Sequence, residues 1–449
     1  MFKKLVNVFV NLVRNYLPDP FLFAGILTVV VFVLGVLFTG QSVVQMAVHW
    51  GNGAFSLLGF SMQMALVLVT GHTLASTPIV KRLLGWAAGL PNSPKAAIVS
   101  VTVVATVGSY INWGFGLVVG ALYARELARR VKDLDYGLLI ASAYSGFVIW
   151  HSGLSGSIPL LLATGGAAVE KATGGVVKGI IPISETIFAT FNLVAVGLIL
   201  VTMPFLNAAM HPDKEHTVVV DPKNLVDEKE EEAPANPTFA DKMERSPIMS
   251  ILIGLLGLTY LGNYFATKGF SALTLDVVNM TFLILGILLH GTPRRYLDAF
   301  GIAAKGAAAI ILQFPFYAGI MGMMVGSVKG GTNLAALMSN FFVDISTVQT
   351  FPVYSFLSAG LVNFFVPSGG GQWAVQAPIV MPAAKELGVE LPKAAMAIAW
   401  GDQWTNMVQP FWALPALGIA GLGARDIMGY CVVVLIWTGI IGCLSFWLF

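Results

Sequence analysis

The chain has 449 residues, of which 56% are apolar and only 11% are charged. A typical soluble domain has about 25% charged residues, so this composition excludes an ordinary soluble globule and favours a membrane protein with many helices. The long uninterrupted apolar runs argue against a β-barrel, whose strands alternate polar and apolar side chains. The net charge is only +2, and the absence of a dense basic patch excludes nucleic acid as a partner.

Residues 1–20 predict an amphipathic helix that lies in the membrane interface. Lys3, Lys4 and Arg14 recur at helical spacing between apolar residues, and Pro18 ends the pattern. No small-residue cleavage site follows the next apolar run, so we do not expect this segment to be a removed signal peptide.

Eleven apolar stretches follow in the chain. Seven are long and regular enough to cross a bilayer as single helices, and they lie at about 21–39, 54–76, 181–205, 247–264, 275–291, 306–325 and 428–448. The other four carry Gly, Pro, Ser or Asn in their middles and lie at about 96–130, 136–165, 351–388 and 393–422. We interpret the first and third of these as re-entrant hairpins, and the second and fourth as broken transmembrane helices.

The polar stretch 207–246 divides the chain into two transmembrane halves, 21–206 and 247–449. It holds 10 of the 23 acidic residues and four prolines, which is typical of a solvated linker. Three similar segments recur in the same order in both halves, at nearly one offset: Gln63 with Gln313, 109–114 with 367–372, and Trp150 with Trp404. The two halves therefore look like a duplication.

The distribution of cations predicts the orientation. With the N-terminus and the linker in the cytoplasm, all nine Arg and 19 of the 25 Lys and Arg lie on the cytoplasmic side. The two hairpins then open to opposite faces of the membrane. We therefore predict an all-α polytopic membrane protein with two inverted repeats, each containing a re-entrant hairpin and a broken transmembrane helix.

The four interrupted segments are where we expect the function. Non-helical backbone at membrane depth is tolerated only where it is buried in protein or lines a wet cavity. Helix N-termini at such breaks bind anions, and free carbonyl groups hold cations. The substrate-binding candidates are Ser109, Asn112, His151, Ser152, Ser155, Ser368, Gly369, Gly370, Gln372, Thr405 and Asn406. The consecutive glycines 369–371 suit a turn whose N–H groups face a ligand.

Asp402 is the carboxylate that lies in the middle of a predicted crossing among polar neighbours. An intramembrane ionisable group is a functional hypothesis by default, so Asp402 would take a proton or hold a sodium ion. Ser145 and Asn112 are further candidates for this coupling-ion site. The alternatives are that Asp402 only caps a half-helix and that His151 is a packing histidine. Beyond a possible sodium ion, we expect no metal and no cofactor.

The broken segments carry no Arg or Lys in mid-span. A site for a dicarboxylate would often use a strong cation, so hydroxyls, amides and helix dipoles favour a substrate with one carboxylate on a small apolar body. A membrane-embedded enzyme would need a motif such as HExxH or a second aspartate, and neither is present. A channel would rarely need inverted hairpins, which leaves a transporter as the favoured class.

Four long segments resemble the bacterial short-chain fatty acid transporter family. They are SYINWGFGLVVGALYARELAR, YSGFVIWHSGLSGSIPL, FFVPSGGGQWAVQAPIVMPAAKELG and AWGDQWTNMVQPFWALPALGIAGL. Through the wider ion-transporter superfamily, the resemblance implies two inverted repeats, a homodimer and an elevator-type movement of the substrate domain. It also implies a non-enzymatic transporter in the bacterial inner membrane that takes up acetoacetate, butyrate or similar acids.

The resemblance leaves the coupling gradient open between sodium and protons. An ion-coupled transporter of another small organic anion, a dicarboxylate or a peptide-like acid, remains the alternative function. Carboxylate-binding members of the superfamily often carry Ser-Asn-Thr at both hairpin tips, whereas this chain has SYIN at one and PSGG at the other. The positions that carry over are Ser109, Asn112 and Ser368.

Overall fold

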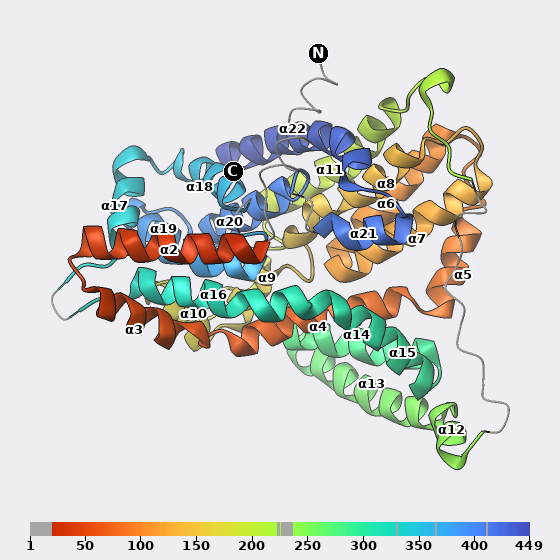
Figure 1. The fold of residues 1–449 in the computed structure, drawn as a ribbon, viewed down its shortest axis with the longest axis horizontal. Helices are drawn as coiled ribbons and strands as arrows, with labels where there is room; N and C mark the ends of the chain where they lie inside the picture. The colour runs from red at the N-terminus through yellow and green to blue at the C-terminus, as the bar shows by residue number, and fades with distance from the viewer. Residues whose placement is uncertain (1–19, 222–224, 226–236, 329–330, 364–365, 410–411) are drawn as a thin grey trace.

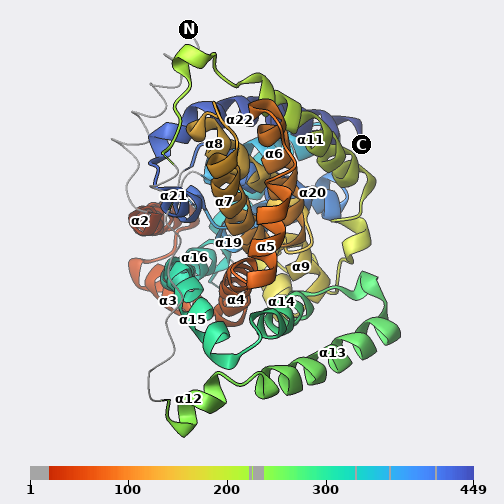
Figure 2. The same ribbon diagram turned by 90° about the vertical axis from the view of Figure 1, so that its right-hand side faces the viewer.

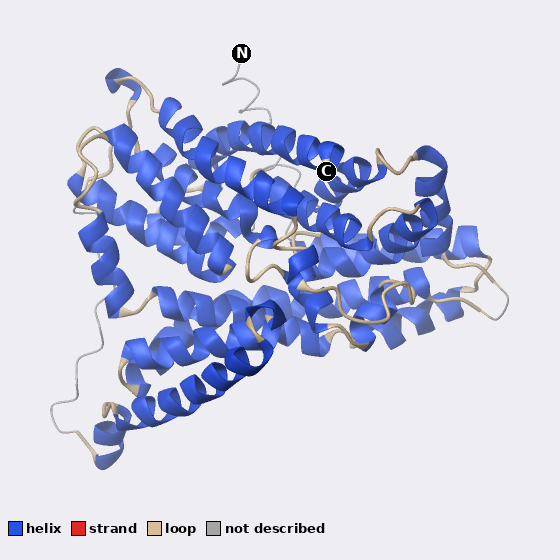
Figure 3. Ribbon diagram, turned by 180° about the vertical axis from the view of Figure 1, so that it is seen from behind, coloured by secondary structure: helices blue, strands red, loops and turns tan. Residues whose placement is uncertain are grey.

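The computed structural model describes residues 20–221, 225, 237–328, 331–363, 366–409 and 412–449. Helices, turns and loops make up all of these residues, and none of them forms a strand (Figure 3). The predicted interfacial helix falls on residues 1–19 and Pro20, so nearly all of it lies outside the described part of the chain.

The first half contains ten helices in its described part, together with short 3₁₀ turns. They are α2 (Pro20–Thr39), α3 (Val43–Ala54), α4 (Leu58–Ala75), α5 (Pro78–Ala87), α6 (Pro94–Ile111), α7 (Trp113–Arg130), α8 (Tyr136–Ser145), α9 (Ser157–Thr164), α10 (Ala167–Ala172) and α11 (Thr190–Ala209), with the 3₁₀ helices η1 (Gly146–Ser152) and η2 (Ile183–Glu185).

The linker and the second half continue the helical pattern. Their helices are α12 (Phe239–Glu244), α13 (Ile248–Lys268), α14 (Leu275–His290), α15 (Pro293–Ala304), α16 (Ala308–Val325), α17 (Leu334–Ile345), α18 (Phe351–Asn363), α19 (Gly369–Leu387), α20 (Leu391–Thr405), α21 (Ala413–Ala420) and α22 (Ala424–Leu448). The 3₁₀ turns are η3 (Lys214–His216), η5 (Phe270–Ala272) and η6 (Lys305–Ala307).

Helix starts follow local capping chemistry. Ser42, Thr77 and Ser93 each accept a hydrogen bond from the N–H group three residues later, and proline follows Thr77 and Ser93 at the first helical position. These side chains satisfy amides that the first turn of a helix leaves unpaired.

The two halves share an order of elements. In each half two consecutive helices, α6 and α7 or α18 and α19, precede an interrupted helix. The interrupted helix of the first half is α8–η1–α9, and that of the second half is α20 followed by α21. The sequence predicts a re-entrant hairpin and a broken helix in each of these places, and the re-entrant arrangement and the inversion of the repeats stay predictions.

The interrupted helices lie in the core. α6 packs against α7, α8 and η1, whereas α20 packs against α18, α19 and η1, so the two halves meet at η1 and α20. Residues 138–153 and 394–403 are all buried. Figures 1 and 2 show α2, α3, α4 and α16 together on one side, and α13 at the edge of the molecule beside α14.

Several boundaries differ from the prediction. The crossing expected at 181–205 is instead α11, because Pro182 begins a stretch of short turns that lasts until residue 189. Ile183 and Ile187 in this stretch are fully buried, so the apolar residues here pack in the core without forming a helix. The short helices α3, α5, α10, α12, α15 and α17 were not predicted.

Part of the predicted linker contacts the body of the protein. The N–H of Val218 donates to Oδ2 of Asp135 at 2.9 Å, and the N–H of Tyr136 donates to the Val218 carbonyl at 2.9 Å. The guanidinium of Arg129 donates to the carbonyl of Leu225. This part of 207–246 is thus fastened to the junction of α7 and α8, and residues 207–209 still belong to α11.

In the described part of the chain, seven helical segments are long and apolar enough to cross a membrane, among them Leu58–Ala75, Thr190–Ala209 and Ala424–Leu448. This agrees with a multi-pass membrane protein. The set differs from the seven predicted runs, since α6 and the α8–α9 segment belong to it, whereas α14, with 16 residues, is too short.

Candidate functional site

The first hairpin tip is built around Asn112. This residue ends α6 and begins α7, and its Oδ1 accepts a hydrogen bond from the N–H of Phe115 at 2.9 Å. The next N–H, that of Trp113, donates to Oγ of Ser155 at 2.9 Å. Asn112 and Ser155, both predicted to bind substrate, therefore also hold the tip against the break between η1 and α9.

Ser109 lies one turn before the tip. It is 1% exposed, and its hydroxyl has no hydrogen-bond partner among the described residues. A Cβ at Gly116 would lie 2.4 Å from this hydroxyl, so the α6–α7 crossing requires glycine there. Of the first-tip candidates Ser109 and Asn112, Ser109 is thus the one whose side chain makes no hydrogen bond to another described residue.

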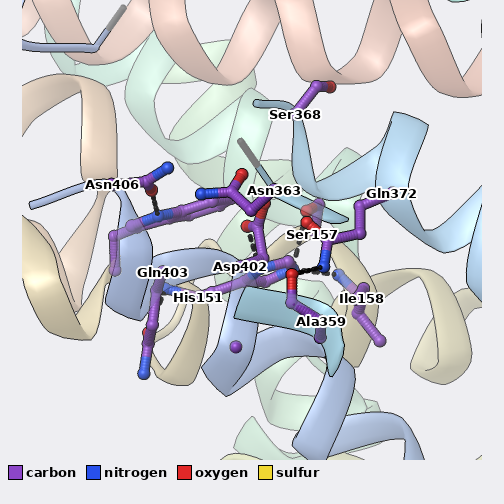
Figure 4. Close-up of polar contacts among 12 residues, drawn as sticks. His151, Ser157, Ile158, Ala359, Asn363, Ser368, Gln372, Asp402, Gln403 and Asn406 are labelled. Atoms are coloured by element: carbon purple, nitrogen blue, oxygen red, sulfur yellow. Dashed lines mark hydrogen bonds and ion pairs between the residues drawn. The ribbon is translucent and has the colours of Figure 1, made fainter. Parts of the chain in front are cut away.

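The centre of the site is a buried pair that joins the two halves. Nδ1 of His151 lies 2.8 Å from Oδ2 of Asp402, and both residues are fully buried (Figure 4). The other ring nitrogen, Nε2, lies 2.8 Å from Oγ of Ser157 and 3.0 Å from the backbone nitrogen of Ile158.

These contacts fix the tautomer of His151. A backbone N–H can only donate, so Nε2 must accept from Ile158 and carries no proton. The ring proton then sits on Nδ1 and is donated to Asp402. His151 is therefore a neutral imidazole in this arrangement, and Oδ2 of Asp402 accepts its Nδ1 proton.

The second hairpin tip lies against this pair. Ser368 caps α19, and its Oγ accepts from the N–H of Gly371 at 3.4 Å. A Cβ at Gly369 would lie 2.4 Å from Oγ of Ser157 and 2.5 Å from Cε1 of His151, so α19 begins in direct contact with the break in the first half. The glycines 369–371, predicted to form the turn, instead form the first turn of the helix; Figure 4 shows the side chain of Ser368 apart from the His151–Asp402 pair.

Hydrogen bonds join the interrupted helices of the two halves. Oε1 of Gln403 accepts from the N–H groups of His151 at 2.9 Å and Ser152 at 3.0 Å, and Nε2 of Gln403 donates to Oγ of Ser152 at 2.7 Å. Oδ1 of Asn406 accepts from Nε1 of Trp150 at 2.9 Å. The 3₁₀ helix therefore exposes its backbone amides to side chains of α20, which explains how an irregular turn persists in the core.

Asn192 supports this arrangement from α11. Its amide donates to the carbonyls of Ser152 at 3.1 Å and Ile187 at 2.7 Å, and its Oδ1 accepts from Nε1 of Trp400 at 2.8 Å. We expect Asn192→Leu to lower stability by at least about 2 kcal/mol, because it leaves three buried polar groups without partners. Thermal unfolding in detergent measures this, and Asn263→Leu, at an exposed position on α13, serves as the control. An unchanged melting temperature would contradict the supporting role.

Three buried oxygens on α18, α19 and α20 have no hydrogen-bond partner among the described residues. They are Oδ1 of Asp402, Oδ1 of Asn363 and Oε1 of Gln372. All three residues are fully buried, and they come from α20, α18 and α19, respectively. A buried acceptor without a donor is costly, so such a group calls for a proton or a cation.

Hydrogen bonding fixes which atom of each amide is the free one. Oγ1 of Thr405 donates to the carbonyl of Gly360 at 2.9 Å, so it must accept from Asn363 and the contacting atom is the Nδ2 group, at 2.9 Å. Nε2 of Gln372 donates to the carbonyl of Ala359 at 2.7 Å, and a carbonyl can only accept. The unpaired atoms of Asn363 and Gln372 are therefore oxygens, which are ligands that a hard cation prefers, whereas the buried Nδ2 of Asn406 is a donor without a partner in the described part of the chain.

Ser145, a coupling-ion candidate, belongs to another polar cluster. Its Oγ accepts from Nδ2 of Asn207 at 2.9 Å and donates to the carbonyl of Ser142 at 2.8 Å. Asn207 also donates to Thr102 at 3.0 Å. This cluster joins α6, α8 and α11, and neither Asp402 nor His151 is among its hydrogen-bond partners.

The sequence analysis named some of the polar residues around His151 and Asp402 and missed others. Of the remaining candidates, Gly370 packs on Phe60, and Thr405 is bonded as described above. The sequence analysis did not name Asn363 or Asn192. The signal that could have identified them is a single amide side chain inside an otherwise apolar helix, because burying an amide costs free energy unless it is hydrogen-bonded. Within the described residues, no group of three or more His, Cys, Asp or Glu is placed to hold a metal ion.

Comparisons with known proteins cover the whole chain. The family model for the short chain fatty acid transporter matches residues 1–449. A protein of Escherichia coli strain K12, provisionally named a short-chain fatty acid transporter, is 47% identical over 100% of both chains. A Haemophilus influenzae protein with the same provisional name is 45% identical over 98% of each chain.

The fold has a counterpart among solved structures. The YdaH transporter of Alcanivorax borkumensis, described as having an unusual topology, superposes with a TM-score of 0.58. The superposition covers 96% of this chain and 97% of that one, at 15% sequence identity. At that identity the likeness concerns the fold alone.

Proposed function

This chain belongs to the short-chain fatty acid transporter family, and from that premise we propose that it is a secondary active transporter of short monocarboxylates such as butyrate or acetoacetate. The resemblance in the sequence is thereby confirmed, and the protein is a transporter and not an enzyme. The substrate, the coupling ion, the inverted repeats, the elevator movement and the homodimer are parts of the proposal.

The chemistry of the site supports a singly charged substrate. The residues around His151 and Asp402 offer hydroxyls, amides and the N-terminus of α19, with no Lys or Arg among the candidate site residues. Helix N-termini and hydroxyls suffice for one carboxylate, whereas a second carboxylate usually recruits a guanidinium or ammonium group. Asp402 repels a further anionic group unless a cation accompanies it.

The three unpaired oxygens support a cation as the partner of that substrate. We propose that they form one site for Na⁺, with Asp402 supplying the charge and Asn363 and Gln372 supplying amide oxygens (Figure 4). A protonated Asp402 would donate only one hydrogen bond and would leave an amide oxygen unsatisfied. In this proposal one sodium ion contacts all three oxygens, and for this reason we favour sodium over proton coupling.

The hairpins supply the element that moves in this proposal. A hydrogen bond joins each hairpin tip to an interrupted helix. At the first tip, the N–H of Leu154 donates to the carbonyl of Tyr110 at 2.7 Å. At the second tip, Nε1 of Trp412 donates to the carbonyl of Pro367 at 2.8 Å. We infer that hairpins and interrupted helices travel together, as an elevator movement requires, with the substrate held between them.

Solute counterflow tests the transport function. Proteoliposomes loaded with unlabelled butyrate should accumulate labelled butyrate from outside in a saturable way, at alkaline pH to limit passive entry of the protonated acid. Acetoacetate should compete, whereas succinate and a dipeptide should not. If protein-free liposomes match the proteoliposomes, or if succinate competes better than acetoacetate, the proposed substrate class is wrong.

Loss of one amide oxygen tests the cation site. We expect Asn363→Leu to raise the sodium concentration needed for half-maximal uptake by about tenfold, which corresponds to about 1.4 kcal/mol of binding energy. The maximal rate at saturating sodium should change less. Asn333→Leu, which removes the cap of α17 away from the site, serves as the control. An equal shift in both variants would argue against Asn363 as a ligand.

A further inference from the structure

A pocket lies far from the His151–Asp402 pair, at the end of the molecule where α12, α13, α14 and α15 meet (Figure 1). Its cavity volume is about 270 Å³, and its lining includes Ser250, Ile253, Arg294, Tyr296 and Leu297. Small-molecule pockets usually have volumes of about 300 Å³ or more, so this cavity is large enough for a lipid headgroup but not for a larger ligand.

Two hydroxyls of the pocket lack partners. Ser250 is 1% exposed, and its Oγ has no hydrogen-bond partner in the described part of the chain. The same holds for the buried OH of Tyr296. A buried hydroxyl that makes no hydrogen bond costs free energy, so both point to a ligand with polar oxygen atoms.

The mouth of the pocket carries both signs of charge. Nη1 of Arg294 lies 3.8 Å from Oε2 of Glu244, and its Nε donates to Oδ2 of Asp298 at 3.1 Å. Arg294 is therefore balanced by carboxylates, and a ligand with only negative charge would be repelled by Glu244. A ligand that brings a phosphate for Arg294 and an ammonium for Glu244 keeps the balance.

The exposed part of the pocket wall is apolar. Ile253 is 43% exposed and Leu297 is 61% exposed, and both line the pocket. α13 packs against α14 and lies at the edge of the molecule, and its neighbouring side chains Leu252 and Leu256 are exposed as well (Figure 2). Acyl chains can therefore leave the pocket along α13 in contact with apolar side chains.

We propose that this pocket binds the headgroup of a zwitterionic phospholipid with a primary ammonium, of the phosphatidylethanolamine type. Arg294 and the hydroxyls of Ser250 and Tyr296 contact the phosphate and the ester oxygens, and Glu244 accepts from the ammonium. Basic pockets between transmembrane helices are known lipid sites, and the carboxylate beside Arg294 selects the zwitterion here.

Native mass spectrometry of the delipidated full-length protein tests the proposal. Phosphatidylethanolamine, phosphatidylcholine, phosphatidylglycerol and cardiolipin are added separately, together with glycerophosphoethanolamine as a headgroup without acyl chains. We expect one phosphatidylethanolamine per chain, bound at least about tenfold more tightly than the other ligands. Equal or tighter binding of phosphatidylglycerol, cardiolipin or the chain-free headgroup would overturn the proposal.

Matched variants locate the site. Ile253→Trp fills the cavity, and Arg294→Gln removes the phosphate contact; each should weaken phosphatidylethanolamine binding about tenfold. Leu252→Trp and Arg295→Gln change the neighbouring residues outside the pocket lining and should bind as the unmodified protein does. If both members of a pair bind alike, the lipid is held elsewhere. Thermal unfolding of all four variants shows that each is folded.

Discussion

Asp402→Asn should reduce butyrate uptake by about 100-fold or more, the consequence of removing roughly 3 kcal/mol of stabilisation from the transport cycle. The amide oxygen of asparagine still accepts from Nδ1 of His151, so the packing is kept while the negative charge is lost. With no charge at 402, neither a sodium ion nor a proton is bound there. Uptake into proteoliposomes measures the effect.

A control separates lost charge from lost folding. Asp344→Asn changes an exposed carboxylate near the end of α17 and should leave uptake unchanged. The Asp402→Asn protein should unfold within a few degrees of the parent. Near-normal uptake by a folded Asp402→Asn protein would show that Asp402 only caps or packs α20.

Gly369→Ala should impair transport by at least about tenfold and lower stability by about 1–3 kcal/mol, the usual cost of overpacking a core. The added Cβ would lie 2.4 Å from Oγ of Ser157, 2.5 Å from Cε1 of His151 and 2.9 Å from the ring of Trp150. All three residues are buried, so the second hairpin would have to retreat from the break in the first half. Counterflow and thermal unfolding measure the two effects.

Gly197→Ala provides the matched control for this substitution. Gly197 lies inside α11, and a Cβ there meets nothing within 4 Å. Alanine should therefore be tolerated and could stabilise the helix by up to about 1 kcal/mol. If Gly369→Ala behaves like Gly197→Ala, the close contact between α19 and His151 is not required for transport.

The elements that sequence reasoning predicted well are those set by local patterns. α13, α14, α16 and α22 lie within a few residues of the predicted runs, because apolar residues continue to a polar, Pro or Gly boundary. Asn112 and Ser368 were predicted to lie at breaks because they are small polar residues inside apolar runs, and each of them caps the helix that follows. Their capping geometry follows from the same local chemistry.

The parts that could not be predicted depend on distant contacts. His151 and Asp402 are 251 positions apart, and nothing local to either reveals that they share a hydrogen bond. The tautomer of His151 depends on Ile158, seven residues away across an irregular turn. In the sequence, Asn363 is an ordinary polar residue in an apolar helix, and only its hydrogen bond to Thr405 shows which way its amide is oriented. Ser145 was grouped with Asp402 because both lie in predicted broken helices. In the structure Ser145 instead accepts a hydrogen bond from Asn207, in a separate polar cluster.

Sodium-driven accumulation tests the central proposal most directly. Proteoliposomes are prepared with equal pH on both sides and the membrane potential clamped at zero, and labelled butyrate is added with an inward sodium gradient or with an equal potassium gradient. The site formed by Asp402, Asn363 and Gln372 predicts accumulation above equilibrium with sodium alone, abolished in Asp402→Asn. Accumulation that needs an inward proton gradient and ignores sodium would contradict it.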